Sequence, residues 1–243
     1  MRNVMLITRD RYRIAALHHD HGQKKVVVLA HGFINNKDVH LFSQIAKGLS
    51  REYDVVAFDF RGHGKSSGLF SWTSREQADI QAVLEYVQSF QYDALGVVGF
   101  SLGAAIALIE AAQNPEIKTV IAVSAPYDFW QIDYHFWKPG MIDDLKLNFG
   151  YKGKGKGVRP GNLWEPKIAP IDVVDRIAPR PVLFIHGSDD WLIHPRHSRE
   201  LYQKAKDPKK LEIIERGGHA EKIFDDYPEV FMRTCRDWLK ENL

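Results

Sequence analysis

A serine stands where a buried strand is expected to turn sharply into a helix, a geometry that exposes its hydroxyl. The chain passes from Val97 and Val98, through Gly-Phe-Ser-Leu-Gly at positions 99–103, into a run of small apolar residues. Strand, tight turn and helix in this order form the context that a Gly-x-Ser-x-Gly nucleophile elbow requires. Both glycines are needed because a Cβ would clash where strand and helix approach closely. The pattern predicts that Ser101 is a catalytic nucleophile.

A serine hydroxyl needs a base beside it, and the base needs a carboxylate that fixes its tautomer and stabilises the imidazolium. His219 follows the last expected strand, directly after two glycines, and is the candidate base. Asp189 and Asp190 follow the preceding strand and are both candidate carboxylates. Serine, aspartate and histidine in this order along the chain are a known arrangement for such triads.

Acyl transfer through a serine also needs hydrogen-bond donors for the oxyanion that forms. The helix after Ser101 directs its first N–H groups and its positive dipole end toward that charge, which favours the Leu102 N–H. Phe33 follows His31 and Gly32 at the end of another buried strand. We expect the backbone N–H groups of Phe33 and Leu102 to form the oxyanion hole.

The other histidines near expected strand ends fit structural roles better. His31, His63 and His186 stand in turns, where we expect them to make structural hydrogen bonds. Their spacing matches no His/Cys/carboxylate metal signature. We therefore expect no metal and no cofactor.

Apolar strands alternate with amphipathic helices along the chain, which predicts a mostly parallel sheet with helices on both faces. Ligands bind such sheets beyond the carboxyl ends of the strands, where the candidate residues stand. Ser74 resembles an N-cap, with Gln77 as its capping-box partner. We expect strands at 2–8, 11–17, 24–30, 54–60, 94–100, 118–124, 181–185 and 211–214, and helices at 40–50, 74–87, 102–112, 195–206 and from 228.

Composition indicates one globular α/β domain over residues 1–243. Hydrophobic residues make up 44% and charged residues 26%, and the formal net charge of +2 implies no polyelectrolyte partner. Cys235 is the only cysteine, so no disulfide forms within the chain. No apolar run reaches membrane-spanning length. We expect a cytoplasmic monomer or homodimer that acts on a small molecule and binds neither nucleic acid nor membrane.

Two glycine-rich stretches suggest other ligands, and their spacing argues against both. The loop at 59–68 lacks the Walker spacing of a phosphate cradle, so we expect a shaped turn near the active site. The alternating Lys-Gly run at 152–157 has aromatic residues nearby but no recognised nucleic-acid module around it.

Residues 127–170 show no clean strand or helix period and concentrate aromatic side chains. A long irregular segment inside a compact domain is usually functional, for example as a lid. We expect this segment to be a cap inserted into the domain. Trp130 and Trp137 are candidates for the substrate pocket, although packing of the cap onto the domain explains the aromatic residues equally well.

Five motifs in order resemble the α/β-hydrolase superfamily over essentially the whole chain. They are His-Gly-Phe at 31–33, Asp-Phe-Arg-Gly-His-Gly-Lys-Ser at 59–66, the serine motif at 99–103, His-Gly-Ser-Asp-Asp at 186–190 and Gly-His at 218–219. The chain is most similar to small bacterial carboxylesterases, including the cinnamoyl and feruloyl esterases. Those enzymes insert a cap where this chain has 127–170.

The resemblance implies the identity of the acid and the class of reaction. The family often reads His-Gly-x-x-Asp, a spacing that selects Asp190 over Asp189, whereas some relatives place the acid where this chain has Asp128. The implied activity is hydrolysis of carboxylic esters through an acyl-enzyme, with thioesters, amides and short peptides as alternative substrates. A catalytically silent binding or regulatory protein on the same fold is the other possibility. Epoxide hydrolases and dehalogenases on this scaffold carry aspartate at the elbow, so Ser101 argues against both.

Overall fold

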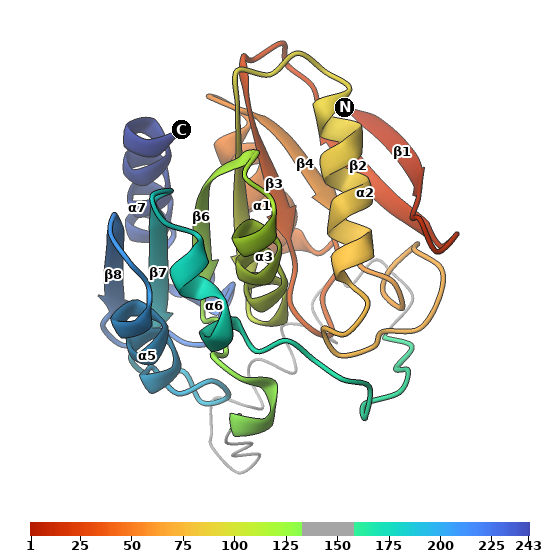
Figure 1. Cartoon of the computed structure of the whole chain (residues 1–243). Helices are drawn as coiled ribbons and strands as arrows, with labels where there is room; N and C mark the ends of the chain where they lie inside the picture. Colours follow the sequence, from red (N-terminus) through yellow and green to blue (C-terminus); the bar gives the residue numbers. More distant parts are fainter. Residues whose placement is uncertain (133–157) are drawn as a thin grey trace.

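The computed structural model describes residues 1–132 and 158–243, so Trp137 and the Lys-Gly run lie outside the described residues. In the described part, eight strands form one sheet in the order β1-β2-β4-β3-β5-β6-β7-β8 (Figure 1). The strands are β1 (Arg2–Ile7), β2 (Arg13–His19), β3 (Lys25–Ala30), β4 (Asp54–Phe58), β5 (Ala94–Phe100), β6 (Ile117–Val123), β7 (Val182–Gly187) and β8 (Lys209–Ile214).

The sheet is parallel except at one edge. β1 and β2 form an antiparallel hairpin, and β2 pairs antiparallel with β4, whereas β4, β3, β5, β6, β7 and β8 pair in parallel. The central strands β3, β4 and β5 are apolar along nearly their whole length because helices cover both of their faces. This architecture confirms the predicted α/β class.

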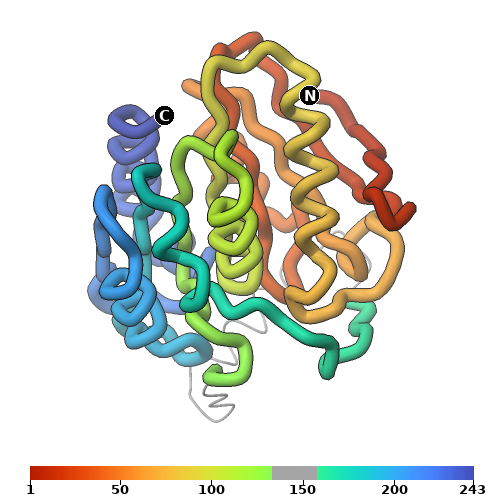
Figure 2. Tube along the Cα trace, in the orientation of Figure 1, coloured from red at the N-terminus to blue at the C-terminus, as the bar shows by residue number. Residues whose placement is uncertain are grey.

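Two helical layers enclose the sheet. One apolar core packs α2 (Gln77–Gln88), α3 (Leu102–Gln113) and α5 (Arg196–Lys204) on one face. The other core packs α1 (His40–Leu49), α6 (Lys222–Asp226) and α7 (Pro228–Asn242) on the opposite face. Figure 2 follows the chain through these layers, and the carboxyl ends of the parallel strands lie toward the lower edge of the view. The short 3₁₀ turn Phe129–Gln131 lies at that same edge (Figure 1).

One local expectation is wrong, and one short helix was not predicted. Ser74 does not cap α2: the helix begins at Gln77 after Glu76, no side chain caps it, and Ser74 Oγ instead donates to the Glu165 carbonyl at 3.4 Å. Tertiary contacts with the 158–170 segment thus replace the local capping box. The short helix α6 was not foreseen, because five residues are too few to show a helical period.

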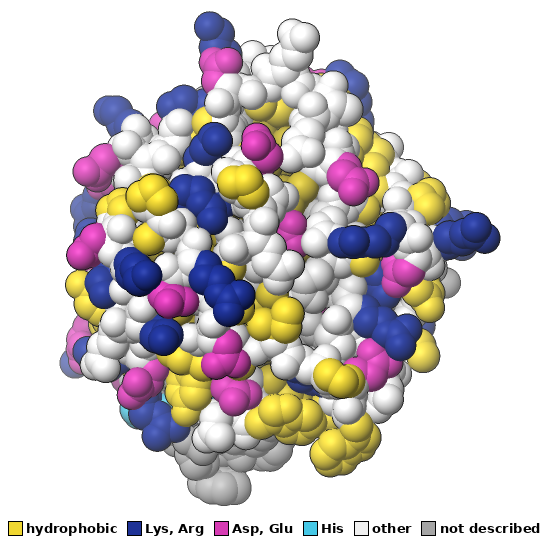
Figure 3. Space-filling model, viewed as in Figure 1, with side chains coloured by type: hydrophobic (Ala, Val, Ile, Leu, Met, Phe, Trp, Pro, Cys, Tyr) yellow, Lys and Arg dark blue, Asp and Glu magenta, His cyan; other side chains and the backbone are white. Residues whose placement is uncertain are grey.

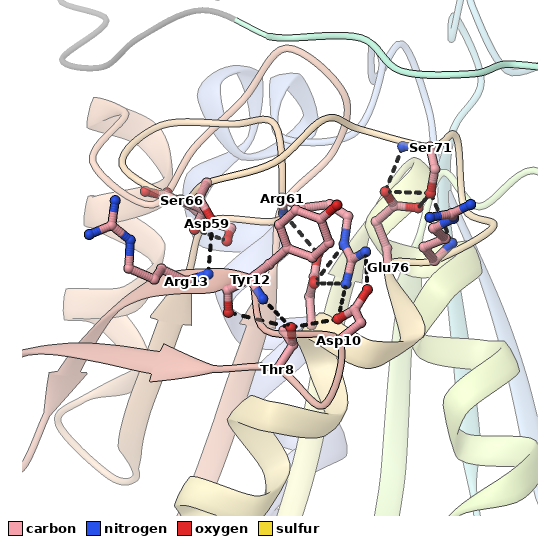
Figure 4. A network of polar contacts seen from close by, with 12 residues as sticks. Thr8, Asp10, Tyr12, Arg13, Asp59, Arg61, Ser66, Ser71 and Glu76 are labelled. Atoms are coloured by element: carbon pink, nitrogen blue, oxygen red, sulfur yellow. Dashed lines mark hydrogen bonds and ion pairs between the residues drawn. The ribbon is translucent and has the colours of Figure 1, made fainter.

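Buried charges hold the loop between β4 and α2. The Arg61 side chain is 1% exposed, and its guanidinium contacts the carboxylates of Asp79 and Asp10 at 2.7 Å each. Figure 4 shows Arg61 beside Asp10 and the Tyr12 ring. Backbone N–H groups of Lys37 and Lys65 donate to the loop's own Asp59 carboxylate at 2.8 and 2.9 Å.

Candidate active site

Ser101 occupies a sharp turn between β5 and α3. Its φ of 52° and ψ of −122° lie outside the regions that a residue with a side chain normally adopts. Such a conformation costs about 1–3 kcal/mol and persists only where the surroundings enforce it. A Cβ at Gly99 would lie 2.6 Å from Ala104 Cα, so only glycine allows helix and strand to approach this closely. The sequence therefore builds the strained turn that the motif predicts.

The structure brings Ser101, His219 and Asp190 together from three separate loops. His219 Nε2 lies 3.0 Å from Ser101 Oγ, and His219 Nδ1 lies 2.8 and 3.0 Å from the two oxygens of Asp190. A carboxylate only accepts, so Nδ1 carries the hydrogen and Nε2 is left to accept the serine proton. This is the geometry of a serine activated by an oriented base.

Asp190 is enclosed by donors. Its carboxylate is 0% exposed, and the N–H groups of Leu192 and Ile193 donate to Oδ1 at 3.0 and 2.8 Å. Burial acts to raise the pKa of Asp190, but His219 and His186 outweigh it and hold that pKa well below its ordinary value. The buried carboxyl group is therefore ionised where it can orient His219.

The other two acid candidates lie elsewhere. Asp189 Oδ1 accepts from Ser188 Oγ at 3.0 Å. Although Asp189 is adjacent to Asp190 in sequence, the carboxylate that contacts His219 is that of Asp190. Asp128 Oδ1 accepts from the Trp130 N–H at 2.8 Å and caps the short turn that follows. Of the three aspartates, only Asp190 is brought to the histidine.

The two expected oxyanion donors flank Ser101. Leu102 is the first residue of α3, where a helix leaves its N–H groups unpaired. Gly32 approaches so closely that a Cβ on it would lie 3.1 Å from Ser101 Cβ, which brings the next peptide, with the Phe33 N–H, beside the serine. Within the described part of the chain, neither N–H donates to another backbone group. Both are available to an oxyanion.

Two buried hydrogen bonds fix the loop that carries His219. The Ala220 N–H donates to Ser124 Oγ at 3.0 Å, at the end of β6. Asn35 Nδ2 donates to Glu221 Oε1 at 2.5 Å, which joins the loop of Phe33 to the loop of His219 across 186 residues. The loop of the expected oxyanion donor, Phe33, and the loop of the expected base, His219, are therefore fixed relative to each other.

An aromatic wall beside Ser101 was missed by sequence reasoning. The rings of Phe33 and Trp72 lie 4.6 Å apart, and Trp72 also contacts Phe70 at 5.5 Å and Phe129 at 5.8 Å. With Leu102, these residues form a small apolar cluster separate from the two main cores. Trp72 and the neighbouring threonine have positive φ angles, 58° and 79°. No sequence motif predicts this turn.

Trp130 lies at the rim of a pocket that opens beside Leu102. The pocket has a volume of about 170 Å³, and its lining includes Ala105, Phe129 and Trp130. Trp130 is 51% exposed and stacks on the 78% exposed ring of Trp164, with centroids 5.6 Å apart. Figure 3 shows hydrophobic side chains gathered on the surface at the lower edge of the view.

His31 and His63, two of the histidines expected in structural turns, hydrogen-bond backbone groups. His31 Nε2 accepts from the Phe60 N–H at 3.0 Å, and burial lowers the pKa of His31 to about 4. Burial likewise lowers the pKa of His63 to about 3, so both rings are neutral at physiological pH. Among residues 1–132 and 158–243, no group of three or more His, Cys, Asp or Glu side chains could hold a metal ion.

Comparison with known proteins assigns the family. Residues 25–155 match the model of the alpha/beta hydrolase fold family, so the chain belongs to that family. It is 28% identical over 240 residues to the uncharacterized protein YqkD of Bacillus subtilis, covering 90% of this chain and 72% of that protein. It is 22% identical to a pimeloyl-[acyl-carrier protein] methyl ester esterase of Neisseria meningitidis, covering 89% of this chain and 77% of the esterase.

Solved structures share the fold at low sequence identity. The Pyrococcus furiosus esterase Pf2001 superposes with a TM-score of 0.80 at 22% identity, covering 99% of this chain and 92% of that one. DcsB in complex with its substrate analogue superposes with a TM-score of 0.85 at 16% identity, covering 100% and 99%. Family, fold and neighbours together support a hydrolase. None of the helices described combines the length and apolarity that crossing a bilayer requires.

Proposed function

We propose that this protein is a serine hydrolase that cleaves carboxylic esters through an acyl-enzyme on Ser101. The observation that carries the proposal is the unbroken series of hydrogen bonds from Ser101 Oγ through His219 to a buried, ionised Asp190. A catalytically silent protein on this fold has no need to retain such a series together with two N–H groups beside the serine that donate to no backbone group in the described part of the chain.

The geometry supports a two-step reaction. Ser101 Oγ attacks the ester carbonyl while His219 Nε2 takes the hydroxyl proton, and the N–H groups of Phe33 and Leu102 stabilise the oxyanion. When the carbon–oxygen bond breaks, His219 gives that proton to the leaving alcohol. Water then attacks the acyl-enzyme with His219 again as base, releasing the acid and restoring Ser101.

The substrate class we propose is small esters, including aromatic acyl esters such as hydroxycinnamates. The pocket of about 170 Å³ is smaller than those that hold drug-sized ligands, and the flat rings of Phe129 and Trp130 in its lining suit a planar group. We further propose that residues 127–170 form a cap over the site, with Trp130 at the mouth of the pocket.

The test is a substrate panel run on wild type and Ser101→Ala. Esters, thioesters and amides that vary in acyl length and aromaticity are ranked by kcat/KM, and short or aromatic esters should exceed thioesters, amides and long-chain triglycerides. Ser101→Ala should lose on the order of 10⁴-fold in kcat because the nucleophile is gone. Thioesters or amides at the head of the ranking would reassign the substrate class. Turnover of no substrate, without labelling of Ser101 by a fluorophosphonate, would favour the binding or regulatory protein.

A further inference from the structure

The carboxylate of Asp190 has a second histidine neighbour that the reaction above does not use. His186 is 0% exposed in β7, and its Nε2 lies 3.1 Å from Asp190 Oδ2 and 2.7 Å from the Ile193 carbonyl oxygen. Its Nδ1 lies 2.6 Å from Ser198 Oγ on α5. The contacts that end at Ser101 therefore begin two residues further back, in the order Ser198, His186, Asp190, His219 and Ser101.

The partners of the His186 ring determine where its proton lies. Both neighbours of Nε2, a carboxylate and a carbonyl, only accept, so Nε2 carries a hydrogen. The Ser198 hydroxyl lies within hydrogen-bond distance of the other ring nitrogen, Nδ1, and so holds the far side of the ring. The Nε2–H is shared between the Ile193 carbonyl at 2.7 Å and, at 3.1 Å, Asp190 Oδ2, the same carboxylate oxygen that lies 2.8 Å from His219 Nδ1.

The two oxygens of Asp190 are thus held in different ways. Oδ1 accepts from the N–H groups of Leu192 and Ile193, which are part of its own loop. Among the residues that the structure describes, the contacts of Oδ2 are His219 and His186. A donor from β7 therefore adds a hold from outside the loop, on the oxygen that meets His219.

We propose that His186 is a positioning residue of the hydrolase, whose Nε2–H keeps the Asp190 carboxylate aimed at His219. Ser198 assists by holding the other ring nitrogen of His186. The inference rests on the proposed function, because a carboxylate needs aiming only if His219 acts as a base. A buried charge is stable only when hydrogen-bonded, so loss of this donor should weaken both the ionisation and the orientation of Asp190.

The test compares His186→Leu, which removes the donor, with His186→Gln, which offers an amide N–H in its place. His18→Leu is the matched control: His18 is also 0% exposed, lies in β2 toward the other edge of the sheet, and contacts the hydroxyls of Tyr86 and Tyr92 at 3.0 Å each. Reaction with a fluorophosphonate, followed to completion, counts the folded active sites, and kcat is expressed per site.

His186→Leu should lower kcat per site on the order of 10- to 100-fold with KM little changed, as expected when a reacting group is misplaced by about an ångström. As the pH is lowered, His186→Leu should also lose activity at a higher pH than wild type. Without His186, less opposes the effect of burial, so the pKa of Asp190 rises. His186→Gln should recover most of kcat. His18→Leu should lose stability but keep both kcat per site and the acid side of the pH profile.

Wild-type kcat per site in His186→Leu, or an equal loss in His18→Leu, would overturn the proposal. A measurement on the wild-type protein covers the case in which the variants do not fold. Histidine ¹⁵N NMR should show a hydrogen on His186 Nε2, and a ring whose only hydrogen is on Nδ1 would also overturn it. Normal turnover by Ser101→Ala would instead reject the proposed function, so the two failures are distinguishable.

Discussion

Two adjacent aspartates differ in every contact that matters to His219. Asp190 turns its carboxylate inward to the base and to two backbone N–H groups, whereas the carboxylate of Asp189 contacts the hydroxyl of Ser188. Both are aspartates that follow the same strand, so residue type and position alone do not identify the acid. The His-Gly-x-x-Asp spacing of the family favours Asp190, and the geometry agrees. The difference is open to a direct comparison of variants.

Asp190→Asn should lower kcat severely, on the order of 10⁴-fold, because the amide no longer favours the tautomer of His219 that accepts the serine proton. Asp189→Asn is the matched control and should leave kcat near that of wild type. Steady-state kinetics on one small ester compares the two. A reversal of the two results would assign the acid to Asp189.

The depressed pKa of Asp190 also predicts how stability depends on pH. A carboxyl whose pKa is lower in the folded state stabilises the fold above its unfolded pKa of about 3.9, and that contribution is lost as pH falls toward the folded pKa. The gap in the free energy of unfolding between wild type and Asp190→Asn should shrink from pH 5 downward. Urea unfolding at a series of pH values measures it, and a gap that stays constant would contradict the ionised, hydrogen-bonded carboxylate.

At the scale of elements, the turn Phe129–Gln131 places the rings of Phe129 and Trp130 in the lining of one pocket. Trp130→Ala should therefore change the ranking of esters by kcat/KM more than it changes the rate of phosphonylation at Ser101. Trp164→Ala is the control, because its ring stacks on Trp130 but does not line the pocket. Equal losses on every ester and on the phosphonate would show that Trp130 supports the fold instead.

The loop between β4 and α2 depends on the buried pair of Arg61 and Asp79, whose side chains are 1% and 0% exposed. Asp79→Ala should lower the free energy of unfolding by about 3–5 kcal/mol, because it leaves a buried guanidinium short of its partner. The pair of Arg75 and Glu165, with side chains 57% and 20% exposed, is the comparison. Glu165→Gln should cost less than about 1 kcal/mol. Similar losses in urea unfolding would mean that Arg61 is held chiefly by Asp10.

The elements themselves were largely readable from the sequence. Strands such as Lys25–Ala30 and Asp54–Phe58 are short apolar runs that end at glycine or polar residues, and the helix from Pro228 begins where proline favours a first turn. The predicted N-cap at Ser74 was wrong because a capping box is a local pattern, whereas the Ser74 hydroxyl contacts Glu165, 91 residues away.

At the scale of the whole molecule, the candidate site was predictable where it depends on strand ends and not where it depends on packing. Ser101, His219 and Asp190 each follow a strand, and parallel strands bring their carboxyl ends to one edge. The aromatic wall arises from long-range packing that leaves no periodic signal. The contact of His186 with Asp190 joins residues only four apart, but it depends on the shape of a loop, which no helix or strand period predicts. Trp137 lies outside the described residues, so its role stays a prediction.

The central claim is that Ser101 is a nucleophile activated by His219, and site-resolved covalent labelling tests it most directly. Wild-type protein incubated with a fluorophosphonate, then digested and analysed by mass spectrometry, should carry one adduct on the peptide that contains Ser101. His219→Ala should label far more slowly and Ser101→Ala not at all, with both variants folded by circular dichroism. An adduct on another residue, or equal labelling rates in wild type and His219→Ala, would contradict the account.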